Sequence, residues 1–312
     1  MDAEICRNFL LVTTNFPDKL DNDGKYYFKD DQHFKQYCSN QNCVNELEKV
    51  NAGCLYLLYT FFGSSDLFKS VANSNINIVE YIIIWLSYML NLKEQSGSMT
   101  NLEYFNKTYI NSNEKYTNSI TGVTEYSSYK DLIYKKHDLT KVDIKDISEF
   151  YDAFILLCEM YTGFDTNTSN CTTCSEKANK FVKKCKDLIE NYNNNNNKKS
   201  SSYNKILSTL STDYDNFKIY CNSKGADCED YPLFPEIKTT QLPVQNSENN
   251  SEQFYGHISE DTSSSSPIAN KLFIVLSAFG AIAFFLGISY KYSLFGFRKR
   301  SQKQHLRGKL KK

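Results

Sequence analysis

The sequence predicts an all-α protein: a disulfide-containing helical bundle ectodomain, a disordered stalk and a single C-terminal transmembrane helix. Apolar residues recur every three or four positions through most of residues 1–235, which is the spacing of a buried helix face. Alternating strand patterns and Asn-Gly hairpin signals are absent from the sequence. Near the C-terminus, the 19 consecutive residues 272–290 carry no charge, and a run of this length can span a membrane.

Five apolar stripes each predict one helix of the bundle. They run through residues 50–61, 76–90, 144–161, 181–192 and 206–221. The run YIIIWLSYML within the second stripe is too short to span a membrane and predicts a buried core helix. Gly163 is placed to end the third helix, and Thr100 with Glu103 has the capping-box spacing that begins a further helix. The predicted loops are 91–100, 165–175 and 193–202.

The composition changes after the bundle. Residues 236–271 are rich in Ser, Glu, Asn and Gln and lack helical periodicity, which is typical of a disordered stalk. Residues 272–290 are the predicted transmembrane helix, and residues 291–312 are the predicted basic cytoplasmic tail. Ala283 and Gly287 form a small-xxx-small pair in that helix. An oligomer held through this pair is a minor hypothesis beside an ordinary lipid-facing helix.

Charge is divided at the same boundary. The formal charge is −9 up to Lys271 and +9 after it. By the positive-inside rule, this asymmetry places the tail in a cytoplasm and residues 1–235 on the other side of the membrane. A nucleic-acid partner is not favoured, because the only dense basic run directly follows the predicted span. The basic residues that set this topology include Lys291, Arg298, Lys299, Arg300, Lys303 and Arg307.

The N-terminal residues leave the route across the membrane open. A secretory signal has a basic start and an apolar stretch of about 7–15 residues, whereas here only FLLV follows Asp2 and Glu4. Either the first 270 residues cross by an unusual route, or they stay cytosolic and the tail anchors the protein. The charge asymmetry and the cysteine distribution favour the first alternative.

All cysteines precede the apolar segment. An even number on one side predicts five disulfides in an oxidising compartment, with free buried thiols in a cytosolic protein as the alternative. Cys158 and Cys185 are placed to tie two helices together. With Cys171-x-x-Cys174 they also supply the four thiols of a structural zinc site, although their spacing favours disulfides. Short loops could be closed by Cys38 with Cys43 and by Cys221 with Cys228. The ten candidate disulfide cysteines are Cys6, Cys38, Cys43, Cys54, Cys158, Cys171, Cys174, Cys185, Cys221 and Cys228.

The sequence contains no catalytic motif that we recognise. Its four histidines are scattered, and HExxH, G-x-S-x-G, a glycine-rich phosphate loop and a Rossmann fingerprint are all absent. We therefore expect a protein that is not an enzyme and that needs no cofactor or metal.

Three stretches carry a resemblance to a known family. The C-terminal ANKLFIVLSAFGAIAFFLGISYKYSLFGFRKRSQKQHLR, the N-terminal VNAGCLYLLYTFFG and the central ISEFYDAFILLCEMY resemble the Plasmodium interspersed repeat (PIR; Yir/Bir/Cir) proteins of malaria parasites. The resemblance implies a variant surface antigen with a helical, cysteine-containing ectodomain and one C-terminal span. It also implies a location at the infected erythrocyte membrane, the parasite surface or the parasitophorous vacuole membrane.

We therefore expect a non-catalytic variant surface antigen or exported membrane protein. Its loops would serve immune evasion and interaction with the host cell, with a membrane and an unidentified host receptor or antibody as partners. The alternative is a structural or trafficking protein of an internal or vacuolar membrane that has no host ligand.

Overall fold

The structure is a computed structural model that describes residues 1–237, except for 95–98, 137–138, 140–142, 165–169 and 195–200. The chain divides into two compact units, Met1–Gln241 and Leu242–Lys312. The second unit lies outside the described residues, and so do nearly all of the predicted stalk and the whole predicted span and tail. None of the helices in the described part combines the length and apolar character that a membrane crossing requires.

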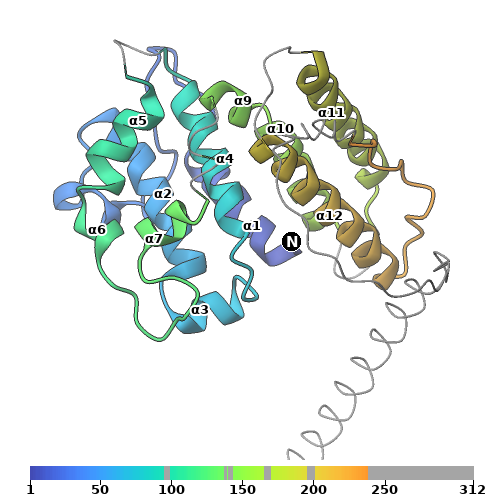
Figure 1. Cartoon of the computed structure of the whole chain (residues 1–312), viewed down its shortest axis with the longest axis horizontal. Coiled ribbons are helices and arrows are strands. Elements are labelled where there is room, and N and C mark those ends of the chain that lie inside the picture. The colour runs from blue at the N-terminus through green and yellow to red at the C-terminus, as the bar shows by residue number, and fades with distance from the viewer. Residues whose placement is uncertain (95–98, 137–138, 140–142, 165–169, 195–200, 238–312) are drawn as a thin grey trace, which may run out of the picture. The chain divides into compact units, whose positions relative to one another are not determined.

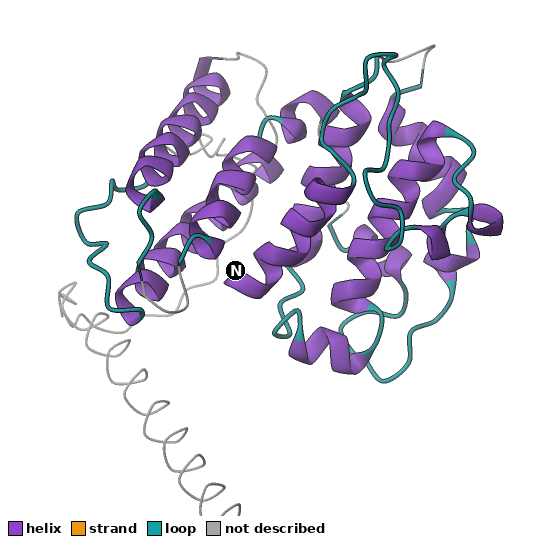
Figure 2. Cartoon of the chain, turned by 180° about the vertical axis from the view of Figure 1, so that it is seen from behind, coloured by secondary structure: helices purple, strands orange, loops and turns teal. Residues whose placement is uncertain are grey.

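The first unit consists of helices joined by loops, and its described residues contain no strand (Figures 1 and 2). Several helices are only one or two turns long. Short 3₁₀ turns (η1, Lys35–Tyr37; η2, Ser39–Gln41) and a π-helical turn (η3, Asn106–Ile110) connect them. The α-helices are α1 (Ala3–Asn15), α2 (Glu46–Phe62), α3 (Ser65–Ser70), α4 (Ile78–Asn91), α5 (Asn101–Phe105), α6 (Glu114–Thr117), α7 (Tyr129–Tyr134), α9 (Ile144–Ser148), α10 (Tyr151–Thr162), α11 (Cys174–Asn194) and α12 (Ser201–Ser223).

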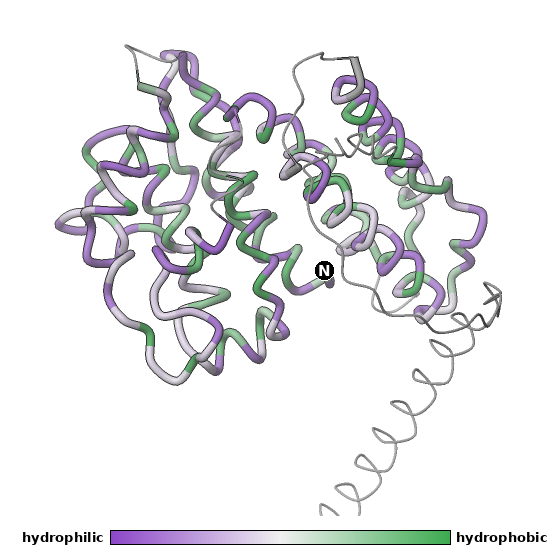
Figure 3. The backbone as a smooth tube through the Cα atoms, viewed as in Figure 1, coloured by the Kyte–Doolittle hydropathy of each residue, from purple (hydrophilic) through white to green (hydrophobic). Residues whose placement is uncertain are grey.

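Helix α4 forms the centre of the core. Twelve of its residues are buried, and ten of these are apolar or aromatic, as expected of a helix surrounded by protein. It packs against α2, α9 and α10, and in Figure 3 its trace is largely green, whereas green and purple alternate along α11. The prediction of a buried core helix at residues 81–90 is confirmed.

Gly53 lets α2 lie close to α4. A Cβ atom at this position would come within 2.6 Å of the Trp85 ring, a distance that real Cβ atoms do not adopt. Phe16, which follows α1, also packs its ring edge-on against Trp85, with centroids 6.2 Å apart. The glycine therefore allows the single tryptophan of the chain to be buried between α2 and the end of α1.

Helix α10 joins the two halves of the bundle. It packs against α1 and α4 on one side and against α11 and α12 on the other, and Figure 1 shows α10, α11 and α12 side by side. Gly163 follows the last residue of α10, as predicted. A Cβ atom there would lie 2.7 Å from the Cys171 sulfur, so the close approach of the next loop requires a glycine.

A buried polar cluster connects the N-terminus with α4 and α12. The Asp213 carboxylate accepts hydrogen bonds from the Met1 ammonium at 2.8 Å and from the Tyr81 hydroxyl at 2.6 Å. The Tyr161 hydroxyl donates to the backbone carbonyl of Asp213 at 3.0 Å. The contacts from Met1 and Tyr81 satisfy a carboxylate that is almost fully buried, which is the condition under which a charge is tolerated in a core.

Candidate functional site

Six of the ten cysteines form disulfides, each closing a short loop. Both short loops indicated by the sequence are closed, by Cys38–Cys43 and by Cys221–Cys228, and Cys171–Cys174 form the third disulfide. This last bond consumes two of the four thiols that the zinc alternative required. Among the described residues, no group of three or more His, Cys, Asp or Glu side chains is arranged to hold a metal ion.

The structure contains three of the five disulfides that the sequence predicts. Cys6, Cys54, Cys158 and Cys185 are free and buried. Cys158 and Cys185 therefore do not tie their helices together. Instead, each of the four fills space in the core as a small apolar side chain. The sequence could not separate these two roles, because both place cysteine on an apolar stripe.

Part of each predicted loop and all of the topology-setting residues fall outside the described residues. Within the predicted loops, this applies to 95–98, 165–169 and 195–200. Lys291, Arg298, Lys299, Arg300, Lys303 and Arg307 belong to the second unit and lie outside as well. The described surface must therefore supply the candidate site.

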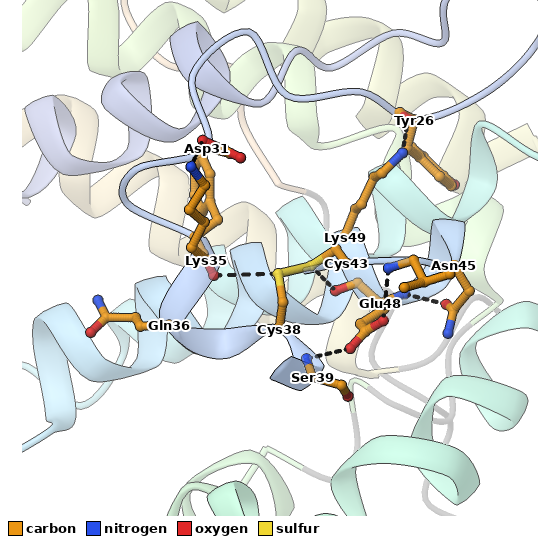
Figure 4. Close-up of a disulfide and its surroundings, with 12 residues drawn as sticks. Tyr26, Asp31, Lys35, Gln36, Cys38, Ser39, Cys43, Asn45, Glu48 and Lys49 are labelled. Atoms are coloured by element: carbon orange, nitrogen blue, oxygen red, sulfur yellow. Dashed lines mark hydrogen bonds and ion pairs between the residues drawn. A yellow bond between two sulfur atoms is a disulfide. The ribbon is translucent and has the colours of Figure 1, made fainter. Parts of the chain in front are cut away.

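The loop closed by Cys38 and Cys43 is the candidate recognition site that the described surface offers (Figure 4). Its two Cα atoms are 4.9 Å apart. Between them, Asn40 and Gln41 adopt φ values of 50° and 58°. These angles are in the left-handed region, which asparagine tolerates better than most residues and glutamine less well. Two consecutive residues in this conformation persist only where the surroundings fix them.

Glu48, in the first turn of α2, holds the loop backbone in this conformation. Its carboxylate accepts hydrogen bonds from the backbone amides of Ser39 at 2.6 Å and Val44 at 3.2 Å, at the two ends of the loop. Burial alone would raise the pKa of Glu48, but the hydrogen bonds from Ser39, Val44 and Asn45 lower it below its ordinary value. The folded loop therefore stabilises the ionised form of the Glu48 carboxylate.

The Asn45 side chain begins α2 beside this carboxylate. It accepts a hydrogen bond from the Glu48 amide at 2.7 Å, which satisfies one of the free amides of the first helical turn. The sequence signal for this arrangement was present, because Asn45 and Glu48 have capping-box spacing. The side chain of Glu48 nevertheless turns to Ser39 and Val44, which only the folded loop brings within reach.

The loop borders a polar cavity of about 590 Å³. In the wall of the cavity, the Lys49 ammonium donates a hydrogen bond to the Tyr26 carbonyl oxygen at 2.8 Å. The Lys35 ammonium forms an ion pair with Asp31 at 2.9 Å. Beside the cavity, the Val44 side chain is 82% exposed, the largest exposed fraction among the large apolar side chains of the described residues. The cavity is lined by Tyr27, Phe28, Lys29, Asp30, Asp31, Lys35, Cys38, Gln41, Asn42, Cys43 and Lys49.

An aromatic group lies next to the loop. The Tyr37 ring contacts Tyr56 and Tyr59 with centroids 6.4 Å and 6.3 Å apart, and the Lys115 ammonium lies 5.8 Å from the centre of the Tyr37 ring. Burial, followed by the neighbouring tyrosines, raises the pKa of Tyr37, so its hydroxyl stays protonated. Such rigid amphipathic side chains suit protein recognition, and nothing in this group supplies a nucleophile with a base.

Comparisons with known proteins identify the family of the chain. The family model described as Plasmodium variant antigen protein Cir/Yir/Bir matches residues 6–291. No curated protein matches the chain. A solved structure entitled "Structure of a Plasmodium PIR protein ectodomain" is 30% identical to the chain. The match covers 76% of this chain and 98% of that one, with a TM-score of 0.58. The resemblance noted in the sequence is therefore confirmed, and the chain belongs to the Plasmodium Cir/Yir/Bir variant antigen family, the PIR proteins.

Proposed function

We propose that this protein is a variant surface antigen of the parasite that acts by recognition and has no catalytic role. A segment at residues 272–290 anchors it in a membrane, and the helical unit is displayed on the side away from the cytoplasm. The observation that carries the proposal is the family match, because it extends from Cys6 through the helical unit to the end of the predicted span. Exposed loops then serve immune evasion and contact with the host cell.

The disulfides support this placement. Disulfides persist in oxidising compartments and are rare in the cytosol, and three are closed in the described unit. The opposite charges of the regions before and after the apolar segment support the same orientation.

The Cys38–Cys43 loop is the part of the described surface best suited to recognition. Its disulfide and the Glu48 hydrogen bonds fix the backbone, so little conformational entropy is lost when a partner binds. Side chains at its tip are exposed and can vary without disturbing the core. We therefore place the contact for antibody or receptor on this loop and on Val44, which directly follows it.

Labelling of intact cells tests the orientation. Antibodies to the helical unit should stain unpermeabilised infected erythrocytes or freed parasites, whereas antibodies to residues 301–312 should stain only after permeabilisation. The same pattern should appear when protease is added, with the tail protected and the helical unit cleaved. If the helical unit becomes accessible only after every membrane is opened, the structural or trafficking alternative is favoured instead.

A paired substitution tests the loop. Val44→Asp should weaken binding of antibodies raised against the native full-length chain, because it places a charge in the proposed contact. Ile219→Asp is the matched control, since this side chain is also apolar and 67% exposed but belongs to α12 and not to the segment that adjoins the loop. If the antibodies bind both variants equally well, the loop is not part of the contact.

A further inference from the structure

Two of the free cysteines meet between α1 and α10. Cys6 and Cys158 are both 0% exposed. Burial and the neighbouring Cys6 thiol raise the pKa of Cys158. The helices that carry them pack together. One turn away, the Phe9 and Phe154 rings are in edge-on contact with centroids 4.8 Å apart.

The register of these contacts shows that the approach of the two thiols is part of the helix packing. Cys6 precedes Phe9 by one turn on α1, and Cys158 follows Phe154 by one turn on α10. This is the register of two helices that run in opposite directions, in which both pairs face each other. The other two free cysteines have different surroundings: the Cys54 thiol lies beside the Tyr116 hydroxyl, and Cys185 is buried on α11.

We propose that Cys6 and Cys158 are an oxidation site, at which a fourth disulfide joins α1 to α10. The oxidant is the disulfide of a thiol oxidoreductase. The thiolate of one cysteine attacks a sulfur of that disulfide, forms a mixed disulfide and releases one oxidoreductase thiol. The thiolate of the second cysteine then attacks the protein-side sulfur of the mixed disulfide and releases the other. The two cysteines lose two protons and two electrons, and the oxidoreductase becomes a dithiol.

The burial of the pair fixes when this reaction takes place. Burial, together with the contact with Cys6, raises the pKa of Cys158 well above its ordinary value, so the packed thiol stays protonated and unreactive. The exchange therefore occurs before α1 has packed onto α10, while the chain folds among oxidoreductases. The structure, with both thiols free, represents the reduced state of this site.

This disulfide would constrain the chain more than the other three. The existing bonds join residues only 5, 3 and 7 positions apart, whereas Cys6 and Cys158 enclose most of the helical unit. A disulfide that closes a longer loop removes more entropy from the unfolded chain. The first helix would then be covalently fixed to α10, which itself contacts both halves of the bundle.

Peptide mapping of the full-length chain tests the inference directly. The protein is taken from infected cells into detergent, denatured, alkylated without reduction and digested with trypsin. The expected product links the peptide 1–7 to the peptide 146–177, and reduction separates the two. Of the four cysteines that are free in the structure, only Cys54 and Cys185 should carry the alkyl group.

The same map separates failure of this inference from failure of the proposed function, on whose oxidising compartment it rests. If Cys6 and Cys158 are alkylated while the three short-loop disulfides are intact, the inference is overturned and the proposed orientation stands. If all ten cysteines are alkylated, both are overturned.

Substitutions provide a second test that does not depend on recovery of a peptide. Cys6→Ala and Cys158→Ala should each lower the Tm of the oxidised full-length chain in detergent by about 5–15 °C. The double variant should be no less stable than either single variant, because both remove the same bond. Cys54→Ala and Cys185→Ala are matched controls whose effects should add. Additive losses for Cys6 and Cys158 would overturn the inference.

Discussion

Hydrogen bonds to the Glu48 carboxylate hold the Cys38–Cys43 loop in its conformation. Hydrogen bonds from the loop outweigh the effect of burial and lower its pKa below the ordinary 4.5. A carboxyl with a depressed folded-state pKa stabilises the fold above its unfolded pKa and loses this contribution as the pH falls through the folded value. We therefore expect hydrogen-exchange protection factors at Ser39 and Val44 to fall as the pH drops below 4.5.

Substitution separates this effect from general acid unfolding. Glu48→Gln removes the charge at every pH, so it should lower the local opening free energy by about 1–3 kcal/mol at neutral pH. It should also abolish the acid-dependent change at Ser39. Glu46→Gln is the matched control, because this carboxylate lies in the same turn of α2 but pairs with Lys93. Equal protection in the wild type and in Glu48→Gln would contradict the assignment.

Asp213 is a second residue on which the fold depends. Asp213→Ala leaves the buried Tyr81 hydroxyl and the Met1 ammonium without their acceptor, so we expect a loss of about 3–5 kcal/mol in unfolding free energy. Asp213→Asn should cost less, because its amide oxygen still accepts from Tyr81. Urea denaturation measures both. Asp215→Asn, exposed on the same helix, should change the stability by less than about 0.5 kcal/mol.

For the elements, the packing of α2 on α4 depends on the absence of a side chain at position 53. Gly53→Ala directs a methyl group at the Trp85 ring, and we expect a loss of about 1–3 kcal/mol in unfolding free energy. Trp85→Phe removes the part of the ring that would be struck. In the double variant, the loss should therefore be smaller than the sum of the two single losses. Urea denaturation followed by circular dichroism measures these losses. Additive losses of unfolding free energy would show that the strain does not arise between the residue at position 53 and the Trp85 ring.

The long apolar stripes of the sequence predicted the long helices of the structure. The stripes at 50–61, 76–90, 181–192 and 206–221 correspond to α2, α4, α11 and α12. The stripe at 144–161 is divided into α9 and α10, because the chain leaves the helix at Glu149 and Phe150 while the apolar spacing continues. Helix α1 was not predicted, because its apolar residues, among them FLLV, form only a short stripe; in the structure Asp2 caps the helix and four of its residues are buried.

The candidate site was less predictable than the helices. Cysteine spacing indicated the Cys38–Cys43 loop, since two cysteines this close in sequence can pair without tertiary structure. The left-handed backbone at Asn40 and Gln41 and the exposure of Val44 depend on the contact between the loop and Glu48. No periodic pattern carries that information, because it arises between a loop and the start of the following helix.

For the whole molecule, the residues after α12 complete the described unit. The Tyr214 hydroxyl donates to the Pro232 carbonyl at 2.8 Å. The Phe234 ring lies 6.1 Å from Phe181, and the Tyr231 ring lies 6.3 Å from Phe217. This segment therefore covers the contact between α11 and α12, and the packed unit extends at least to Phe234.

A pair of truncations tests this boundary. A chain ending after Gln241 should fold without the rest of the protein, with the helical content and single urea transition of a packed domain, because it keeps every core residue of the described part. A chain ending after Asp230 keeps all ten cysteines but loses Tyr231 and Phe234. We expect it to be less stable by about 2–3 kcal/mol, because two partly buried aromatic side chains no longer cover α11 and α12. Its transition should also broaden, since the loss is confined to one pair of helices. Equal stability of the two chains would show that the unit ends at Asp230, and an unfolded longer chain would show that residues beyond Gln241 are required for folding.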